Sequence, residues 1–207
     1  RRRKDKVERI EKSIPMIALR GMTVLPEMVI HFDVSRDKSK KAIEEAMLEE
    51  GQKIFLATQK DMDVEDPKFA DIYSVGTIAM IRQIVKLPKN IVRVLISGEQ
   101  RAELNSLEFE EPYLRANITI LEDIDEVEKK FGSGPNPNVE AMMRGLKEIF
   151  TDFTMRHPKY PKDMAKQLIE KTDLKKLVDS IAANLPIDHK DLQEILEEVD
   201  VLERYQL

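Results

Sequence analysis

The sequence predicts an α+β protein in which strands and helices occupy two consecutive parts of the chain. Residues 14–122 contain short apolar runs rich in β-branched residues and separated by turn residues, a pattern typical of strands. Residues 139–207 carry apolar residues at intervals of three and four, as amphipathic helices do. The segment between them, 123–138, is charged and then rich in glycine and proline, which favours a linker. Residues 1–13 form a basic tail that we expect to be solvated.

The composition argues against several classes of protein. Hydrophobic residues make up 42% of the 207 residues, enough for a core, and charged residues make up 35%. The absence of cysteine excludes disulfide bonds, thiolate nucleophiles and cysteine zinc sites, and it fits a reducing cytoplasm. No apolar run approaches the ~20 residues that span a bilayer, so we expect no membrane partner. The net charge of −5 disfavours nucleic acid as the main partner.

Five segments of the first part have the composition of strands. A turn-forming break, Pro88-Lys89-Asn90, separates 75–87 from 91–97, so these two strands should form a hairpin. Segment 113–121 alternates apolar and polar residues, as a strand with one buried face does. The two remaining strands are expected at 28–34 and 53–58.

One helix interrupts these strands. Ser35 is its expected N-cap, because a serine hydroxyl can accept a bond from a first-turn N–H, and Gly51 is its expected end. Further turns are expected at Gly21, Gly76 and Gly98. Short strands, one helix and these turns together predict a compact, partly closed β barrel or a sandwich.

Three helices are expected in the second part. The first begins near residue 139 and should stop before His157, because the proline that follows disfavours helical backbone in the residue before it. The second covers 174–185 and ends at Pro186, and Asp188 should cap the third. The helical pattern continues to the last residue without a stop signal, so we expect a long final helix that leads into a further segment.

The common patterns of catalytic and cofactor sites are absent. The phosphate-binding pattern GxxxxGK[ST] does not occur, so no nucleotide site is expected. His31, His157 and His189 lack the i,i+4 spacing of a helical zinc site and are expected at the surface, in turns or packed in a strand. We therefore expect no catalytic residue, no cofactor and no metal in this chain.

Two short motifs resemble reactive sites but have simpler explanations. Ser35 and Lys38 match the S-x-x-K pattern of serine–lysine acyl enzymes, but the partner motifs are absent and a helix N-cap explains the serine. Residues 61–65 echo a calcium loop, but Asp66 stands where that loop needs glycine. An acidic, solvated turn explains this segment.

Two features bear on surface contacts. An aromatic content of 5% provides no platform for stacking bases, so only a weak nucleic-acid contact is expected from the basic residues of the hairpin, which are Arg82, Lys86, Lys89 and Arg93. There are ten methionines, whose flexible side chains suit surfaces that accept varied partners. Met22, in the turn 21–23, is the methionine best placed for exposure.

Residues 14–34 resemble the opening of the N-terminal domain of Lon ATP-dependent proteases. The family pattern is P-L-x-x-L-R-x-x-x-x-x-P-x-M-x-x-P, followed by a short strand and a G-R-x-K-S helix start. Two positions depart from this pattern, because Met16 replaces leucine and His31 stands where many members have proline. The matching positions are Pro15, Leu19, Arg20, Pro26, Met28 and 35–39.

Four further segments are similar to family motifs in the same order. Residues 55–61 resemble F-L-x-x-Q-x-D, and residues 71–77 resemble D-L-Y-x-V-G-T. Residues 87–102 resemble L-P-x-G-T-x-x-V-L-V-E-G-x-x-R-A, with 89–91 in place of the glycine-containing turn. Residues 177–186 resemble L-A-D-x-I-A-x-x-L-P, so the resemblance extends through both parts of the chain.

The resemblance implies a fold and a role. It implies a PUA-like barrel over 14–122 and a helical bundle over 139–207 that leads toward an ATPase module and a Ser–Lys protease module. The family's catalytic and nucleotide-binding residues have no positions in this sequence. We therefore expect no enzymatic activity here, and ATP and Mg²⁺ belong to the full-length parent, an ATP-dependent serine endopeptidase.

The same resemblance implies a cytoplasmic, non-catalytic module that recognises unfolded or damaged polypeptides and supports assembly of a homohexamer. Unfolded chains share apolar segments, and a shallow apolar surface would bind them. Core packing is the alternative for each candidate contact. Two other functions stay open, a free-standing Lon-like adaptor and a PUA-like nucleic-acid-binding module. The candidate substrate contacts are Leu19, Met22, His31, Val85 and Leu87.

Overall fold

The computed structural model describes residues 10–122, 137–157, 170, 174–185, 187–199 and 204–205. Most of the predicted basic tail and linker lies outside these residues, but 11–13 belong to the first strand, so the tail is shorter than predicted. Pro186 also lies outside them. The predicted continuous final helix is wrong in its described part, because the helix ends at Glu197 and Glu198 has extended backbone.

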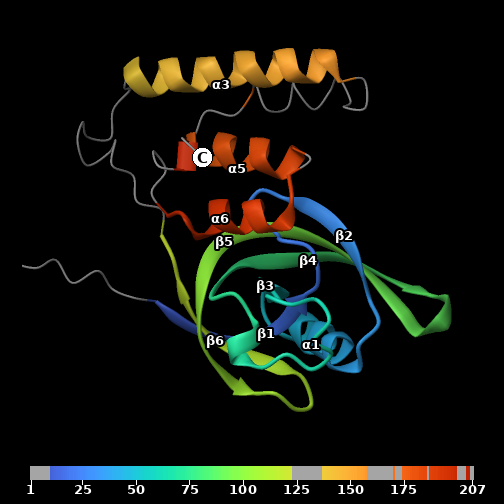
Figure 1. Cartoon of the computed structure of the whole chain (residues 1–207). Helices are drawn as coiled ribbons and strands as arrows, with labels where there is room; N and C mark the ends of the chain where they lie inside the picture. Colours follow the sequence, from blue (N-terminus) through green and yellow to red (C-terminus); the bar gives the residue numbers. More distant parts are fainter. Residues whose placement is uncertain are drawn as a thin grey trace, which may run out of the picture.

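The first part of the chain is a curved sheet that closes on itself (Figure 1). Neighbouring strands follow the order β2-β5-β4-β3-β1-β6, and β5 also pairs with β6, so five strands form a closed ring with β2 attached outside it. Only the β1–β3 pairing is parallel among the described strand pairs. The ring decides between the two predicted alternatives in favour of a barrel. The strands are β1 (Glu11–Leu19), β2 (Val29–Val34), β3 (Lys53–Thr58), β4 (Val75–Leu87), β5 (Ile91–Phe109) and β6 (Leu114–Ile120).

Helix α1 (Asp37–Leu48) covers one opening of the barrel, and its N-cap differs from the prediction. Arg36 occupies the cap position without a side-chain cap bond, so the assignment of Ser35 as the cap is wrong. The helix begins at Asp37, so the residue that precedes it is Arg36 and not the serine. The helix ends at Leu48, with Glu49 as its C-cap, so it stops earlier than predicted; Gly51, with φ of 78°, lies in the turn that follows. The helix buries Ala42, Ile43 and Ala46 in the barrel core.

The β4–β5 hairpin is confirmed, with the short 3-10 turn Pro88–Asn90 between the strands. Gly21 also lies in a turn, with φ of 64°. The predictions of turns at Gly76 and Gly98 are wrong, because both residues lie inside strands. A Cβ on Gly98 would lie 2.2 Å from the carbonyl oxygen of Leu25, so this position needs glycine for close approach of two backbones.

We expect the Gly98→Ala substitution to lower the free energy of unfolding by at least about 1–3 kcal/mol, because the added methyl group meets a backbone carbonyl that cannot rotate away. Urea unfolding followed by circular dichroism measures the change. Gly145→Ala is the matched control, since a Cβ there has no neighbour within 4 Å and lies in a helix. That control should be neutral or stabilising by about 0.5–1 kcal/mol. Equal effects of the two substitutions would contradict this account.

Three helices lie beyond the barrel, in the order α3 (Pro137–Arg156), α5 (Leu174–Asn184) and α6 (His189–Glu197). Figure 1 shows α3 farthest from the barrel, α5 in the middle and α6 against the barrel wall. The predicted cap of α6 is confirmed, because the Asp188 side chain accepts a hydrogen bond from the Lys190 N–H at 3.4 Å. Buried residues of α3 and α5 form a separate apolar core, made of Met143, Phe150, Leu174, Leu177 and Val178.

Helices α5 and α6 are joined to the barrel by shared core residues. Ala182, Leu192 and Leu196 belong to the same apolar core as the residues of the barrel. Polar bonds reinforce this contact, since Thr23 donates to the carbonyl oxygen of His189 at 2.9 Å and Gln193 donates to that of Val75 at 2.9 Å.

A buried ionic group completes the junction. Arg101 of β5 donates two hydrogen bonds of 2.7 Å to the carboxylate of Asp179 on α5. The same guanidinium donates to the carbonyl oxygen of Leu196 at 2.9 Å. Arg204 also contacts Asp179, at 3.4 Å, and all three charged side chains are buried. The barrel, α5 and the end of α6 therefore meet at one buried carboxylate.

Candidate functional site

A small cavity of about 130 Å³ opens between the end of β1 and the segment that runs from β2 into α1. We call it the β1–β2 groove. Apolar and polar side chains contribute to its walls in similar measure, and Arg20 and Arg36 are among the polar ones. The lining residues are Ile17, Ala18, Leu19, Arg20, Met22, Phe32, Asp33, Val34, Ser35, Arg36 and Ser39.

Two of the five predicted contacts lie at this groove. Leu19 lines it but is only 4% exposed, so most of its surface is in the core. Met22 is partly buried and packs against the same core from the turn after β1. An exposed methionine that the sequence did not single out, Met62, lies beside this turn, its methyl carbon 3.6 Å from the position of a Cβ on Gly21. Only the tertiary contact identifies Met62.

The other three predicted contacts lie on the outer face of β2, β5 and β4. The register places Asp33, Arg93 and Val85 opposite one another in a row across these strands. His31 lies two residues before Asp33 and Leu87 two residues after Val85, so both share this face. His31 and Val85 are exposed, and Leu87 is partly buried. The structure thus divides the five candidates between the groove and this face, and their contact with substrate stays a prediction.

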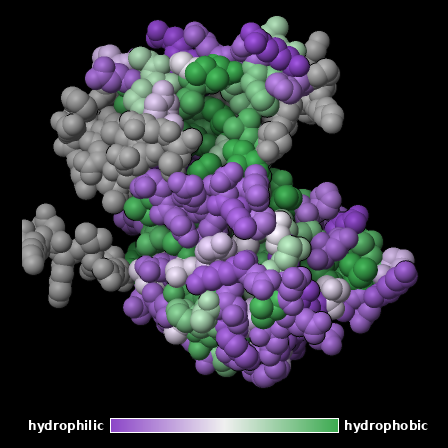
Figure 2. Space-filling model, viewed as in Figure 1, coloured by the Kyte–Doolittle hydropathy of each residue, from purple (hydrophilic) through white to green (hydrophobic). Residues whose placement is uncertain are grey.

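Hydrophobic side chains gather at two places in the space-filling view (Figure 2). The larger group lies in the hollow between α3 and the helices below it, where the separate helical core is located. A smaller group lies over the projecting β4–β5 hairpin. Val85 belongs to this hairpin and is 40% exposed, which supports the choice of this region as a candidate binding surface.

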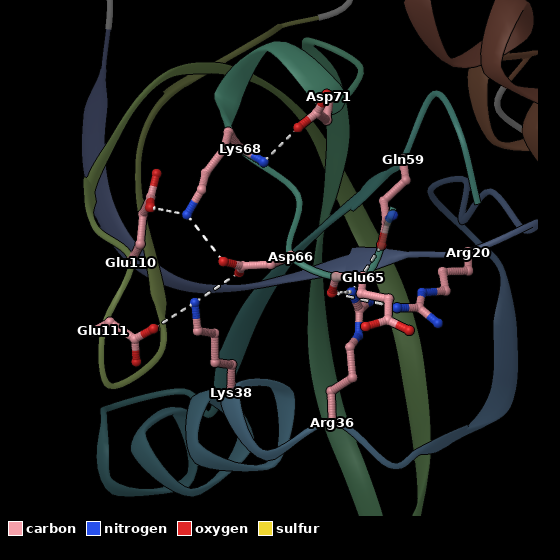
Figure 3. A network of polar contacts seen from close by, with 10 residues as sticks. All are labelled: Arg20, Arg36, Lys38, Gln59, Glu65, Asp66, Lys68, Asp71, Glu110 and Glu111. Carbon is pink, nitrogen blue, oxygen red and sulfur yellow. Dashed lines mark hydrogen bonds and ion pairs between the residues drawn. The ribbon is translucent and has the colours of Figure 1, made fainter. Parts of the chain in front are cut away.

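Arg36 holds the rim of the groove together (Figure 3). Its guanidinium donates to the carbonyl oxygen of Ala18, to Gln59 Oε1 at 2.9 Å and to the carbonyl oxygen of Glu65 at 3.4 Å. Arg20 also donates to Glu65 at 3.4 Å. Burial, and then the nearby charge of Arg20, lower the pKa of Arg36. The sequence offered one signal for this residue, its place in the family's helix-start motif, but that signal did not reveal its contacts.

A chain of ion pairs extends from the groove across the surface (Figure 3). Lys38 Nζ lies 2.8 Å from Asp66 and 2.7 Å from Glu111. Lys68 lies 3.1 Å from the same Asp66 and 2.7 Å from Glu110. These pairs tie the 59–71 loop to α1 and to the β5–β6 turn. The amine of Lys38 therefore has carboxylate partners, which the serine–lysine interpretation did not predict.

Acidification should loosen the 59–71 loop. The hydrogen bonds to Lys38, and then to Lys68, lower the pKa of Asp66. The pKa of Lys38 is raised by Asp66 and then Glu111, and the pKa of Lys68 is raised by Glu110 and then Asp66. A lowered carboxyl pKa stabilises the fold above the unfolded-state value of about 4, and this stabilisation is lost as the pH falls through the folded-state value. The lysine contributions are present below a pH of about 10.4 and are lost only above it. We therefore expect the loop's amide protection to be constant near neutral pH and to fall below about pH 4.

Hydrogen exchange measured as protection factors tests this expectation. Asp66→Asn should give the reduced loop protection already at neutral pH. Asp37→Asn is the control, because Asp37 is almost fully exposed and its contact with Lys40 is long, at 3.8 Å. Unchanged loop protection in Asp66→Asn would mean that these ion pairs do not hold the loop.

The remaining candidate motifs form no reactive constellation in the described part of the chain. Asp61 accepts a bond from the Asp63 N–H at 2.9 Å, as in a solvated turn. His157 contacts the Phe153 carbonyl oxygen and His189 contacts Asp188, each at 2.9 Å. Within the described ranges, no three acidic, histidine or cysteine residues are grouped as metal ligands would be. No helix described here has the length and apolar character needed to cross a bilayer.

Comparison with known proteins identifies relatives over nearly the whole chain. Residues 13–207 match the family described as "ATP-dependent protease La (LON) substrate-binding domain". The chain is 39% identical over 199 residues to the Lon protease of Lachnoclostridium phytofermentans and 40% identical over 196 residues to that of Bacillus thuringiensis. Each alignment covers 94% of this chain but only 23% of the relative, so the chain spans less than a quarter of these proteases.

Solved structures show the same fold at lower sequence identity. The N-terminal domain of the Mycobacterium avium complex Lon protease superposes with a TM-score of 0.71 at 22% identity, covering 94% of this chain and 95% of that domain. The Lon N-terminal domain protein from Xanthomonas campestris gives a TM-score of 0.62 at 14% identity, with the same coverage. The extent of the family match and the identity to these proteases lead to one conclusion: the chain belongs to the family of ATP-dependent protease La (Lon) substrate-binding domains.

Proposed function

We propose that this chain captures unfolded or damaged polypeptides for a Lon-type ATP-dependent serine protease and has no catalytic activity of its own. The observation that carries the proposal is the match to the substrate-binding domain family over residues 13–207. Exposed apolar side chains beside the β1–β2 groove and on the hairpin support it, among them Val29, Met62 and Val85. Such side chains suit a partner whose common property is unburied apolar sequence. ATP and Mg²⁺ would serve the parent protease.

A titration with an unfolded test protein examines this proposal. The chain should increase the fluorescence anisotropy of a labelled protein that is kept unfolded by reduction and alkylation of its cysteines. The native form of the same protein is the control and should bind much more weakly. The chain alone should hydrolyse neither ATP nor the test protein. Equal binding of the native and unfolded forms, or no binding at high chain concentration, would contradict substrate capture.

We also propose a contribution to assembly of the homohexamer. Helix α3 supports this second role, because it exposes Ile149 at 70% and Met155 at 81%, unusually large values for apolar side chains. Sedimentation of the chain over a range of concentrations tests it. Self-association that is weakened by an Ile149→Lys, Met155→Lys double substitution would support the role. A chain that stays monomeric at all concentrations would contradict an assembly role for α3.

A further inference from the structure

Strand β2 has one open edge. Among the strands described, it pairs only with β5, through residues 29–34 and 92–97. The opposite edge of β2 borders the β1–β2 groove, which Phe32, Asp33 and Val34 help to line. An unpaired strand edge presents backbone donors and acceptors to any extended chain that reaches it.

The hydrogen-bond pattern shows which backbone groups point to this open edge. In an antiparallel ladder, bonded and non-bonded residue pairs alternate. Gly98 N–H donates to the Met28 carbonyl oxygen at 2.8 Å, which makes this a bonded position. Two residues along, Ile30 and Ile96 should therefore form the next bonded pair.

The neighbouring strand gives the same answer independently. Ile81, which pairs with Ile96 in β4, donates its N–H to Gln52 at 3.0 Å and so directs it away from β5. The backbone groups of Ile96 must then point toward β2. It follows that Val29, His31 and Asp33 direct their N–H and C=O groups away from β5, into the open edge.

Common protections against strand pairing are missing along this edge. Proteins often block an exposed edge with proline, lysine or an unpaired charge. Strand β2 contains neither proline nor lysine, and the charge of Asp33 is paired with Arg93 at 2.8 Å. Val29 is 67% exposed, so no described segment covers the start of the strand. The family pattern often has proline where this chain has His31, and a proline there would remove the central outward N–H.

The side chains beside the edge are apolar on the groove side. Ile30 and Phe32 are partly buried and pack against the barrel core, on the face opposite to His31. In an added strand, every second side chain would lie beside Ile30 and Phe32 and near Met22. This arrangement selects an extended segment with apolar residues at alternate positions.

We propose that the open edge of β2 binds an extended segment of unfolded polypeptide by strand addition, with backbone hydrogen bonds to Val29, His31 and Asp33. The inference rests on the proposed function of substrate capture and specifies how capture occurs. Main-chain bonds are independent of sequence, so they give affinity for many unfolded chains, while the alternate apolar positions give selectivity.

Two substitutions at one residue separate the backbone from the side chain. His31→Pro removes the outward N–H without breaking the β2–β5 ladder, and it restores the residue of the family pattern, so the protein should fold. His31→Ala removes the side chain and keeps the N–H. The probe is a labelled unfolded peptide that alternates valine and threonine. We expect His31→Pro to weaken its binding about three- to tenfold and His31→Ala to change it less than about twofold.

Hydrogen exchange provides a second measurement that needs no substitution. The peptide should increase protection of the Val29, His31 and Asp33 amides and leave the hairpin tip at 88–90 unchanged. Peptides methylated on backbone nitrogens should bind less well when the methyl groups fall on one set of alternate residues and normally when they fall on the other. This pattern would stand even if His31→Pro failed to fold.

The outcomes distinguish this inference from the proposed function. Suppose that both His31 variants bind the peptide as tightly as the wild-type chain does, and that no β2 amide gains protection. Strand addition is then wrong and substrate capture stands. If the wild-type chain binds no unfolded polypeptide at all, substrate capture itself fails. If the β2 amides become protected on raising the chain concentration without peptide, a second copy occupies the edge and the inference is overturned.

Discussion

The Asp179→Ala substitution is expected to lower the free energy of unfolding by about 3–5 kcal/mol. Asp179 is buried and accepts two hydrogen bonds of 2.7 Å from Arg101, with Arg204 at 3.4 Å. Its removal leaves two buried guanidinium groups without this carboxylate. The cost is therefore the desolvation of charges that have lost a partner, which exceeds the value of an ion pair at the surface.

Urea unfolding followed by circular dichroism measures the effect. Asp152→Ala is the matched control, because Asp152 is exposed on α3 and pairs with Arg156 at 3.3 Å in an i,i+4 arrangement. The Asp152→Ala substitution should lower the free energy of unfolding by only about 0.2–0.5 kcal/mol. The ionic junction would be unimportant if Asp179→Ala cost no more than the control. A double replacement, Arg101→Met with Asp179→Leu, should recover part of the loss, because it leaves Arg204 as the one buried charge of the three instead of two unpaired guanidinium groups.

The Leu196→Ala substitution is expected to lower the free energy of unfolding by about 2–5 kcal/mol. Leu196 is fully buried on α6 and belongs to the core that also contains Leu25 and Ile96 of the barrel part. Deleting its side chain removes apolar contacts and leaves a cavity between α6 and the barrel, and both effects destabilise the fold.

The same experiment tests whether the barrel and the inner helices unfold together. Because they share one core, the substitution should shift the unfolding transition by the same amount whether the circular dichroism of the strands or that of the helices is followed. Leu48→Ala is the control, since Leu48 is 81% exposed at the end of α1 and should change stability by less than about 0.5 kcal/mol. Two separate transitions in the wild-type protein would show that α6 is not part of the cooperative unit.

Local sequence patterns predicted most elements because the forces that form them act between near neighbours. The hairpin, with β4 and β5 around Pro88–Asn90, follows from β-branched runs and one turn. The Asp188 cap follows from a single side chain and the N–H two residues later. The errors at Gly76 and Gly98 have one cause, since a glycine suits a turn and a close approach of two backbones equally well, and its neighbours do not show which occurs. The error at Ser35 is local, because Arg36 occupies the cap position.

The candidate site was predictable only in outline. Leu19 stands in the family motif and Met22 in the turn after it, and both do lie at one groove, but neither pattern could tell that Leu19 is mostly buried. Arg36 was assigned only to the start of a helix, although its guanidinium bonds Ala18 and Gln59, which lie 18 and 23 residues away in the chain. Contacts of this kind depend on how β1, α1 and the 59–71 loop meet in space.

By itself, the sequence determined the family, the α+β class, the order of the elements after β1 and the absence of a phosphate-binding pattern, because all of these reside in contiguous residues. It did not predict β1 itself. The tertiary structure decided three other matters. It closed the sheet as a barrel, left one edge of β2 open, and joined Arg101 to Asp179 across 78 residues. The physical reason is that strand pairing and buried charge pairing join residues far apart in the chain. The roles of Gly98, of strand β2 and of Arg101 depend on such distant partners, which local periodicity does not encode.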